Sequence, residues 1–533
     1  MRGLSVDRRR IILNIGTSVI SRFLLLLSAL YVRRLLIRDI GNEYNGLNSL
    51  YADIIGVLSV AELGAGCAIV FSMYSPIAGG DREKVSELYC LYRKLYRIIG
   101  SVIFAGGLAV MCFLPHLIDD CDQLPVNVYA TFFITLISAV LTYLFSAKTA
   151  LIEAFRDNYV TTAILTVARL SCYALQSACI LLWKSYELFL ICRIIETGII
   201  WGLTEFAVRK MHGDILAVPK KRNPAAAPEV SRNIRAMFMH KIGTILVNST
   251  DSIIISGFAG VAVLGLYTNY QYLAVVLSGT VSLFFTPLTS IVGHLCATGT
   301  AAKSEKCFKI MYCLNYILGV VFFLGYYAVI DSIVEMFFGA DLAIPRSMIF
   351  ILTFSQFVSF MRRTTLLFRD ASGTFYNDRI KPVAEGIINL ILSLILVCIL
   401  PDEYCITGVV SATVITTLTI CHTVEPYVVF RHVFGKSPKY FYIRNYGGMA
   451  VFAAGELFMQ QLCRTSGNPL RLAVTNGFLS MLVSLLILSL LYAADRRFRS
   501  AFRYLAGNII NMSAGMLNRI RTMHVNAAGR RLL

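Results

Sequence analysis

Long apolar runs recur along this sequence and constrain its fold more than any other feature. A run of roughly 18 to 25 apolar residues is long enough to cross a bilayer as an α-helix. Hydrophobic residues make up 57% of the 533 and charged residues only 15%, unlike a soluble domain. The sequence predicts an all-α polytopic membrane protein with fourteen transmembrane helices, near residues 11–32, 49–74, 96–116, 126–146, 159–182, 187–208, 235–258, 266–295, 310–335, 347–366, 383–400, 406–428, 446–462 and 471–493.

Membrane topology explains the net charge of +18. With the N-terminus in the cytoplasm, most of the 49 Lys and Arg fall in cytoplasmic segments, as the positive-inside rule requires. This distribution predicts two cytoplasmic termini, contacts with anionic membrane lipids and no nucleic-acid partner. The cysteines lack metal-ligand spacing and no nucleotide-binding P-loop is present, so we expect no metal and no cofactor.

A cytoplasmic loop at residues 209–234, which contains KKRNPAAAP, separates six spans from eight. Because six spans return the chain to the same side of the membrane, a repeat across this loop is parallel. The predicted segments are an N-lobe at 1–208, a C-lobe at 235–430, two further spans at 431–494 and a basic tail at 495–533. Apolar residues recur in the tail every three or four positions, which predicts an amphipathic helix on the inner leaflet; a regulatory or partner-binding tail is the alternative.

Two short segments support the repeat. GNEYNGLNSLY (41–51) and GVAVLGLYTNY (260–270) share the pattern G-x4-G-L-x3-Y at an offset of 219 residues, and both follow an odd-numbered span at the predicted outer face. The same offset relates Arg22 in the first span to Lys241 in the seventh. Each half is therefore predicted to place a cation in the inner half of its leading helix.

Charged residues within the predicted spans are the candidate functional residues. A charge near the bilayer centre costs roughly 2.5 to 3.5 kcal/mol on insertion scales, so it usually faces a bundle interior or a water-filled pathway. The candidate substrate-binding cations are Arg22, Lys241, Arg169 and Arg193, and the candidate coupling or packing carboxylates are Glu62, Asp251 and Glu196. Arg193 and Glu196, three residues apart, are also spaced to neutralise each other.

Glu62 lies in the stretch SVAELGAGCAIVFSMY, where a carboxylate is unexpected. One interpretation places it in a cleft between the lobes, where it faces water or a coupling cation. The other gives it an interhelical hydrogen bond or salt bridge that only fixes packing, and both remain open. On the first interpretation, Gly64, Ala65 and Gly66 are predicted to let a neighbouring helix approach closely.

Several stretches resemble one family of membrane transporters. The segments NSTDSIIISGFAG, GLYTNYQ and FRDASGTFYNDRIKPVAEGIINLILSLILV, together with the region around Glu62, are similar to the polysaccharide-transporter (Wzx-like) branch of the multidrug/oligosaccharidyl-lipid/polysaccharide (MOP) flippase superfamily. The resemblance covers nearly the whole chain up to about residue 445 and implies two six-helix lobes in a V, a MATE-like fold. It also implies a bacterial inner membrane location and export of an undecaprenyl-diphosphate-linked oligosaccharide for capsule, exopolysaccharide or O-antigen. By this resemblance, Arg22 occupies a first-helix position of the kind held to contact the diphosphate or acidic sugars.

Three other functions compete with this interpretation. A lipid-linked peptidoglycan precursor flippase shares the carrier chemistry, and an ion-coupled drug antiporter of the MATE type shares the fold but would favour carboxylates in its cavity. A membrane glycosyltransferase is disfavoured because the predicted outer loops are short, so we expect no enzymatic activity. The energy for transport is expected to come from a proton or sodium gradient, from the membrane potential or from removal of the product, and these alternatives remain open. Expected partners are the lipid-linked glycan, membrane lipids and, as a further alternative, a polysaccharide polymerase and glycosyltransferases.

Overall fold

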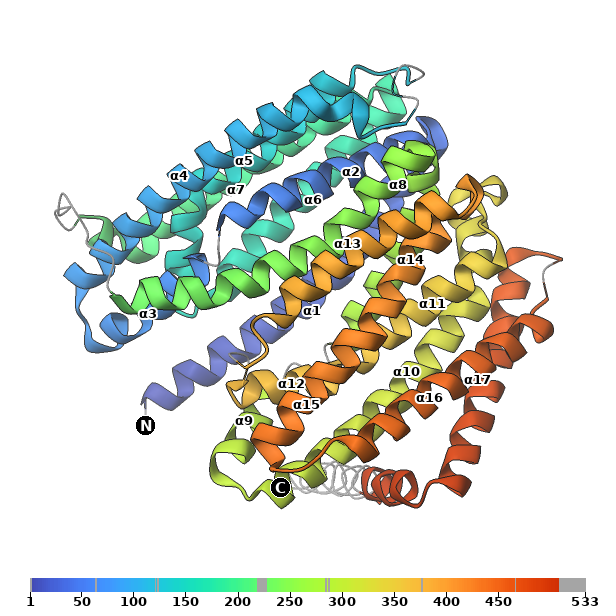
Figure 1. Cartoon of the computed structure of the whole chain (residues 1–533). Helices are drawn as coiled ribbons and strands as arrows, with labels where there is room; N and C mark the ends of the chain where they lie inside the picture. Colours follow the sequence, from blue (N-terminus) through green and yellow to red (C-terminus); the bar gives the residue numbers. More distant parts are fainter. Residues whose placement is uncertain are drawn as a thin grey trace, which may run out of the picture. The chain divides into compact units, whose positions relative to one another are not determined.

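A computed structural model of the chain describes residues 2–62, 65–119, 121, 124–217, 228–282, 285, 288–374, 377–464 and 466–507. The side chains of helical residues 2–15, 19, 65, 67, 68, 217, 228–248, 290 and 291 fall outside this description. Helices joined by short connections form the described part of the chain, which contains no β-strand (Figure 1). The predicted all-α class is confirmed.

The chain divides into two compact units. The first comprises Met1–Tyr272, Phe337–Ile344 and Arg379–Thr413, and the second comprises Leu273–Met336, Pro345–Asp378 and Val414–Leu533. The first unit contains α1 (Arg2–Asp39), α2 (Asn42–Leu58), η1 (Ser59–Glu62), α3 (Ala65–Gly79), α4 (Arg82–Phe113), η2 (Leu114–His116), α5 (Val128–Ala154), α6 (Asn158–Trp183), α7 (Tyr186–Ala217), most of α8 (Pro228–Ser282), η4 (Ala340–Leu342), α13 (Lys381–Ile399), η6 (Asp402–Tyr404) and most of α14 (Cys405–Thr416).

The second unit contains the end of α8 and most of the later helices. These are α9 (Leu288–Thr298), most of α10 (Ala301–Phe338), α11 (Arg346–Met361), α12 (Arg363–Ala371), the end of α14, η7 (Thr417–Cys421), α15 (His422–Val429), η8 (Phe430–Phe434), α16 (Lys439–Leu462), α17 (Pro469–Ala494) and a helical segment at 496–507.

Polar residues determine where several helices begin. Asp81 caps α4 by accepting a hydrogen bond from the Lys84 amide over 2.9 Å. Asn127 caps α5 in the same way, and Asn468, followed by Pro469, caps α17. These side chains satisfy amide groups that a first helical turn leaves without intrahelical partners.

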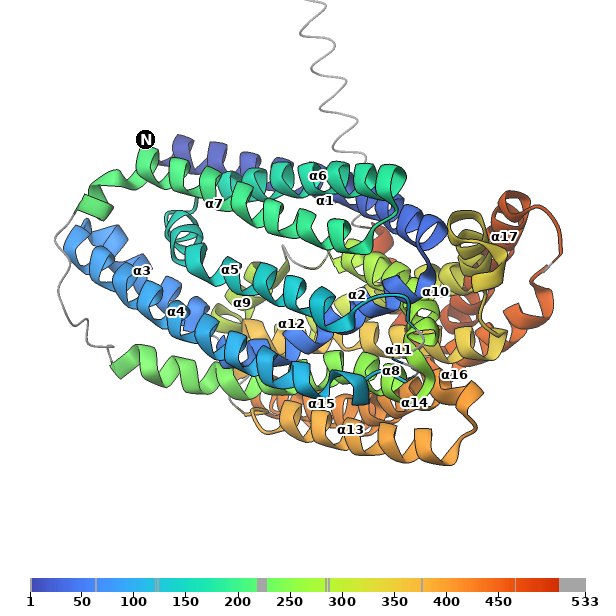
Figure 2. The same cartoon turned by 90° about the horizontal axis from the view of Figure 1, so that it is seen from above.

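In the first unit, five helices pack as successive neighbours in the order α4, α5, α7, α6 and α1. Figures 1 and 2 both show α4 beside α5, and Figure 2 shows α6 between α1 and α7. The shorter helix α2 contacts α1, α4 and α5. This arrangement places side chains of α1, α6 and α7 close together.

The two copies of the repeated motif pack against each other within the first unit. Gly41, before α2, and Gly260, inside α8, both have positive φ, at 146° and 80°, and each is followed by a helix. A Cβ added at Gly46 would lie 1.9 Å from the Val261 carbonyl oxygen, and one added at Gly265 would lie 2.5 Å from the Asn42 carbonyl oxygen. The contact is reciprocal, because 46 pairs with 261 and 42 pairs with 265 at the same offset of 219.

The last residue of each motif copy is a tyrosine, Tyr51 in the first and Tyr270 in the second, and the two have similar surroundings. Tyr51 is fully buried and its hydroxyl contacts the first residue of α5, donating to the Val128 carbonyl over 3.2 Å. Tyr270 is also fully buried, and its hydroxyl accepts a hydrogen bond from the Ile344 amide, two residues before α11, over 3.2 Å. Each motif therefore anchors the chain at the start of a later helix.

In the second unit, α10 packs against α11 and α16 through buried polar contacts. Asn315 donates to the Phe360 carbonyl of α11 over 3.2 Å. Tyr312 donates to the Asn445 side chain over 2.9 Å, and Tyr316 donates to the Gly448 carbonyl over 2.8 Å. Helix α16 contacts α17 in turn.

Eight helices in the described part of the chain are long and apolar enough to cross a membrane. They are Arg82–His116, Val128–Ala154, Asn158–Trp183, Ser249–Ser282, Ala301–Phe338, Lys381–Ile399, Asp402–Phe434 and Pro469–Ala494. A multi-pass membrane protein is therefore confirmed, whereas the count of fourteen spans and the two-lobe layout remain predictions.

The structure differs from the predicted elements at two places. The predicted span at 49–74 is divided into α2, the 3₁₀ turn η1 and α3, with the change at Glu62. The predicted loop at 209–234 is shorter, because α7 continues to Ala217 and α8 begins at Pro228. Apolar periodicity stops where the chain leaves the bilayer, but a helix need not, so hydropathy underestimates these ends.

Candidate functional site

An ion pair between a half-exposed arginine and a buried glutamate joins α6 to α7 in the first unit. The Nε atom of Arg169 lies 2.5 Å from Oε1 of Glu196, and the Glu196 side chain is only 8% exposed. Glu196 therefore takes its cation from the neighbouring helix. The sequence had offered Arg193, three residues before Glu196 on the same helix, as a local partner. A pairing between helices is not visible in sequence spacing, because it depends on how the helices are rotated against each other.

Arg33 of α1 is a second cation in this region. Its Nε donates to the Asn269 side-chain oxygen and its Nη2 to the Thr268 hydroxyl, both over 3.1 Å. The guanidinium also lies 5.0 Å from the centre of the Tyr272 ring, within the range of a cation–π contact. Arg33 is not among the cations predicted from the sequence, because an arginine at the end of an apolar run, next to Arg34, is ordinary.

Asn45 of α2 connects this arginine to the repeated motif. Its amide nitrogen donates to the Asn269 side-chain oxygen over 3.1 Å and to the Thr268 hydroxyl over 3.2 Å. The same two acceptors thus serve both Asn45 and Arg33. The reciprocal packing of the two motifs therefore holds the side chains that position the Arg33 guanidinium.

Two tyrosines bring these cations into one polar region. Tyr173 of α6 interacts electrostatically with both Arg169 and Arg193. Tyr272 interacts with both Tyr173 and Arg33. Arginines from α1, α6 and α7 therefore interact with one or the other of these two tyrosines, and we define Arg33, Arg169, Arg193, Tyr173 and Tyr272 as the arginine cluster. Its charge is offset in part by Glu196, and such a region can bind an anionic group.

The other two predicted cations are Arg22 and Lys241. The Arg22 side chain is exposed on α1, near the exposed apolar residues Phe23 and Leu24. The backbone at Lys241 is in α8, but its side chain lies outside the described residues. The predicted pairing of these two cations by the repeat therefore stays a prediction.

Asp251 belongs to a group of oxygen-bearing side chains in the same unit. Its carboxylate interacts with the Thr413 hydroxyl of α14, and the Asn389 amide of α13 donates to that hydroxyl over 3.0 Å. Oδ1 of Asp251 and Oδ1 of Asn389 are both buried and have no hydrogen-bond partner among the described residues. We call Asp251, Asn389 and Thr413 the oxygen cluster. Oxygen ligands of this kind suit a hard cation or a proton.

A second carboxylate lies beside the oxygen cluster. Asp53 of α2 interacts electrostatically with Asp251 and with the Ser252 hydroxyl. A cation or a proton between two neighbouring carboxylates would reduce the repulsion between them. The sequence identified Asp251 as a candidate but gave no reason to group it with Asn389 or Thr413, which lie far along the chain.

Glu62 lies apart from these clusters, at the end of η1. Its Oε1 accepts a hydrogen bond from the Tyr96 hydroxyl of α4 over 2.5 Å. The Tyr96 ring stacks on Tyr92, with centroids 4.2 Å apart. A Cβ added at Gly66 would lie 2.2 Å from the Tyr96 hydroxyl. The predicted close approach at Gly66 therefore exists, and the approaching group is a tyrosine side chain.

No family model and no curated protein matches this sequence. Solved structures do resemble it. The lipid II flippase MurJ in an inward closed conformation aligns with a TM-score of 0.63 at 13% identity, covering 91% of this chain and 99% of MurJ. An inward-facing multidrug resistance transporter of the MATE family aligns with a TM-score of 0.57 at 12% identity, covering 81% and 98%.

A third similar structure is a MOP superfamily transporter from Pyrococcus furiosus. It aligns with a TM-score of 0.52 at 13% identity, covering 84% of this chain and 96% of the transporter. At such low identities the likeness concerns the fold, and function has to be inferred from the site. This chain therefore has the fold shared by MurJ and the MATE transporters.

Proposed function

We propose that this chain is a flippase that moves an undecaprenyl-diphosphate-linked oligosaccharide from the inner to the outer leaflet by alternating access. The glycan is the repeat unit of a capsule, an exopolysaccharide or an O-antigen. The observation that carries the proposal is the arginine cluster, in which three helices bring guanidinium groups to one tyrosine pair. Guanidinium groups bind phosphate oxygens through paired hydrogen bonds.

The physical requirement of the reaction fits this cluster. A diphosphate cannot enter hydrocarbon without counter-charges, which fixed arginines supply in place of water. The lipid tail can remain in the bilayer while the head group crosses. In this mechanism Arg33, Arg169 and Arg193 bind the diphosphate, and Glu196 holds Arg169 in position between transport cycles.

The fold likeness to MurJ supports a lipid-linked substrate as a class. Export of a peptidoglycan precursor is therefore the second candidate, because it uses the same diphosphate carrier. A drug antiporter is the third, supported by the MATE-like fold, although a cluster rich in arginine repels organic cations. In this proposal the protein lies in the bacterial inner membrane with both termini in the cytoplasm. Its partner proteins are glycosyltransferases and a polysaccharide polymerase.

Ion coupling is a further part of the proposal. The oxygen cluster supplies two buried oxygens that lack hydrogen-bond partners among the described residues, on Asp251 and Asn389. We assign the coupling proton or sodium ion to this cluster. Occupancy of the cluster would neutralise Asp251 and so favour one conformation of the transporter over the other.

Transport in proteoliposomes tests the proposed substrate. Arg33→Gln, Arg169→Gln and Arg193→Gln should each reduce flipping of undecaprenyl-diphosphate-linked oligosaccharide by about tenfold or more, since each removes a charge-assisted hydrogen bond. Arg38→Gln, at an exposed arginine on the same helix as Arg33 that pairs with Asp39, is the matched control and should transport normally. Flipping of lipid II instead would favour the second candidate, and unchanged flipping by all three variants would contradict the role of the cluster.

A further inference from the structure

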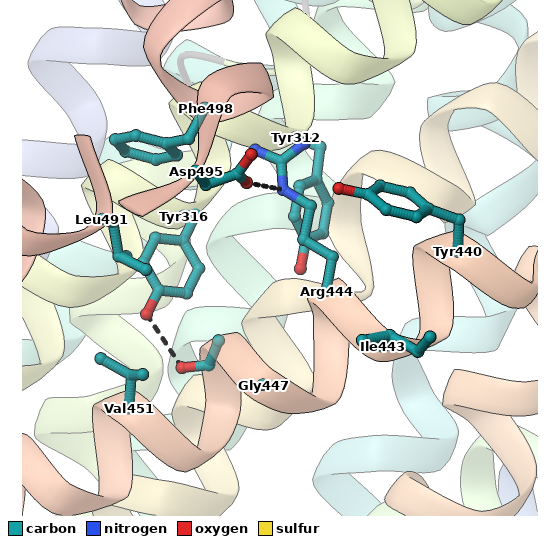
Figure 3. Close-up of a pocket in the computed structure, with 11 residues that line it drawn as sticks. Tyr312, Tyr316, Tyr440, Ile443, Arg444, Gly447, Val451, Leu491, Asp495 and Phe498 are labelled. Atoms are coloured by element: carbon teal, nitrogen blue, oxygen red, sulfur yellow. Dashed lines mark hydrogen bonds and ion pairs between the residues drawn. The ribbon is translucent and has the colours of Figure 1, made fainter. Parts of the chain in front are cut away.

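A cavity of about 310 Å³ lies in the second unit, and none of the residues assigned to transport lines it. Helices α10, α16 and α17 and the segment at 496–507 line it. Its walls are mainly aromatic and aliphatic, and they include Tyr316, Val451, Leu491 and Phe498 (Figure 3). The volume is at the lower end of the range for ligand pockets, and the apolar walls suit a hydrocarbon chain.

Arg444 of α16 lies at one side of this cavity (Figure 3). Its side chain is only 14% exposed, and Nε lies 3.1 Å from an Asp495 carboxylate oxygen. The other end of the guanidinium, Nη2, is buried and has no hydrogen-bond partner among the described residues. A buried donor without a partner is energetically costly, and a charged one more so. Asp495 and the Tyr312 ring, 5.6 Å from the guanidinium, therefore leave Nη2 of Arg444 without an acceptor among the described residues.

A second cavity of about 190 Å³ shares Arg444, Tyr312 and Tyr440 with the first. Its lining adds three more cations, Lys309, Lys436 and Arg497, but only one acid, Glu305. Both lysines already contact Glu305, each at 2.5 Å. Arg497 lies 3.7 Å from the centre of the Tyr440 ring. Positive charge thus exceeds negative charge around the shared residues.

We propose that these two cavities form a binding site for one anionic glycerophospholipid of the membrane. The phosphate accepts hydrogen bonds from Nη2 of Arg444 and interacts with Arg497, while an acyl chain fills the apolar cavity beside Tyr316 and Leu491. The site combines a cationic end and an apolar chamber, which matches the two chemically distinct parts of such a lipid. The predicted topology places this end of α16 at the cytoplasmic leaflet, where anionic lipids attract cationic residues.

The bound lipid has a structural consequence. Asp495 pairs with Arg444 and stands directly before the helical segment at 496–507, and Phe498 of that segment is 3% exposed and lines the cavity. An acyl chain beside Phe498 would add contacts between this segment and α10 or α16. Lipid binding therefore secures the start of the C-terminal tail against the helical bundle, a role separate from transport.

Native mass spectrometry and thermal unfolding of the full-length, delipidated protein test the site. Phosphatidylglycerol should be retained as one molecule and should raise the Tm, whereas phosphatidylcholine with the same acyl chains should do neither. Arg444→Gln should weaken phosphatidylglycerol binding by about tenfold or more, because it removes a charge-assisted hydrogen bond. Arg496→Gln removes an equal charge from an exposed position on the tail segment and should bind normally.

Two further variants separate lipid binding from folding. Asp495→Asn breaks the ion pair but leaves the guanidinium, so binding should be kept or strengthened. A loss equal to that of Arg444→Gln would show that the ion pair matters only for structure and would overturn the proposal. Gly447→Leu should block the apolar cavity with Arg444 intact, since an added Cβ there meets nothing within 4 Å; unchanged lipid retention in this variant would refute the acyl-chain site.

Competition experiments identify the ligand source. Inorganic phosphate should not displace phosphatidylglycerol, because it cannot use the apolar cavity, and displacement at millimolar concentration would contradict the two-part site. Undecaprenyl phosphate should also fail to compete. Displacement by an equimolar amount of that lipid would assign the cavity to the transported substrate and overturn the proposal, while leaving the test of the arginine cluster unaffected.

Discussion

The Tyr96 hydroxyl donates a hydrogen bond to Oε1 of Glu62 over 2.5 Å, so a tyrosine from α4 holds the carboxylate at the end of η1. Gly66 leaves the space that the Tyr96 hydroxyl occupies, because a Cβ there would be 2.2 Å away. This contact supports the packing role of Glu62 and leaves its role in ion coupling to experiment. A packing role predicts that substitutions here change stability, whereas a role in ion coupling predicts that they change the ion dependence of flipping.

Tyr96→Phe should lower stability by about 1.5–3 kcal/mol, the range for a hydrogen bond to a charged group. Glu62→Gln should cost less, because the amide oxygen can still accept from the tyrosine. Thermal unfolding in detergent measures both changes, and Tyr129→Phe, at an exposed tyrosine in α5, is the control. If Glu62 binds the coupling ion, Glu62→Gln should also remove the dependence of flipping on pH or sodium. A Glu62→Gln protein with unchanged stability and unchanged ion dependence would contradict both roles.

Substitution at the crossing of the two motifs should destabilise the first unit. Gly46→Ala and Gly265→Ala would place a Cβ 1.9 and 2.5 Å from backbone oxygens, and backbone cannot move aside as a flexible side chain can. We expect a loss of about 1–3 kcal/mol for each, as for other overpacked sites, seen as a lower Tm. Gly198→Ala in α7 meets nothing within 4 Å and should be neutral or slightly stabilising. Equal Tm values for all three would refute the close crossing.

The repeat-related cations make a separate prediction. Arg22→Ala and Lys241→Ala should each lose flipping while the protein still inserts and remains stable, because both remove positive charge from the proposed path of the diphosphate. Their effect is measured in the same proteoliposome assay, with membrane insertion and Tm as controls. Near-normal flipping by the Arg22→Ala, Lys241→Ala double variant would show that neither cation is needed for transport and that both act only in packing.

Asp251→Asn tests the oxygen cluster. The substitution keeps the shape and the interaction with Thr413 but removes the charge, so flipping should become independent of a proton or sodium gradient with little change in Tm. Ser101→Ala, at an exposed hydroxyl of α4 that donates to the Arg97 carbonyl, is a control remote in sequence. Gradient-dependent flipping that persists in Asp251→Asn would assign coupling to other residues.

Topology is tested by reporter fusions. A fusion at residue 122 should report the outer side of the membrane, and a fusion at residue 533 should report the cytoplasm, because the distribution of Lys and Arg favours both termini inside. Fusions that report the same side at both positions would rule out the fourteen-span arrangement.

In the candidate sites, local sequence patterns predicted individual charged residues but not the residues that they contact. Asp251, Arg169, Arg193 and Glu196 were identified because a charge within an apolar run stands out in any sequence. Their partners were not identified: Glu196 pairs with Arg169 of α6, and Asp251 meets Thr413 of α14. Arg33 was missed because its position at the end of an apolar run is ordinary. Its contacts with Asn269, Thr268 and Tyr272, which appear in the tertiary structure, distinguish it from the exposed Arg34.

The sequence by itself determined the helical class, the membrane location and the two glycine motifs, since hydropathy, charge and turn residues act over a few neighbouring positions. Tertiary structure decided that Gly46 meets Val261 and that arginines from three helices interact with Tyr173 and Tyr272. It also decided that Nη2 of Arg444 is buried without a partner among the described residues. These relationships depend on how each helix is rotated and how closely it packs, and the spacing of residues along one chain does not encode either quantity.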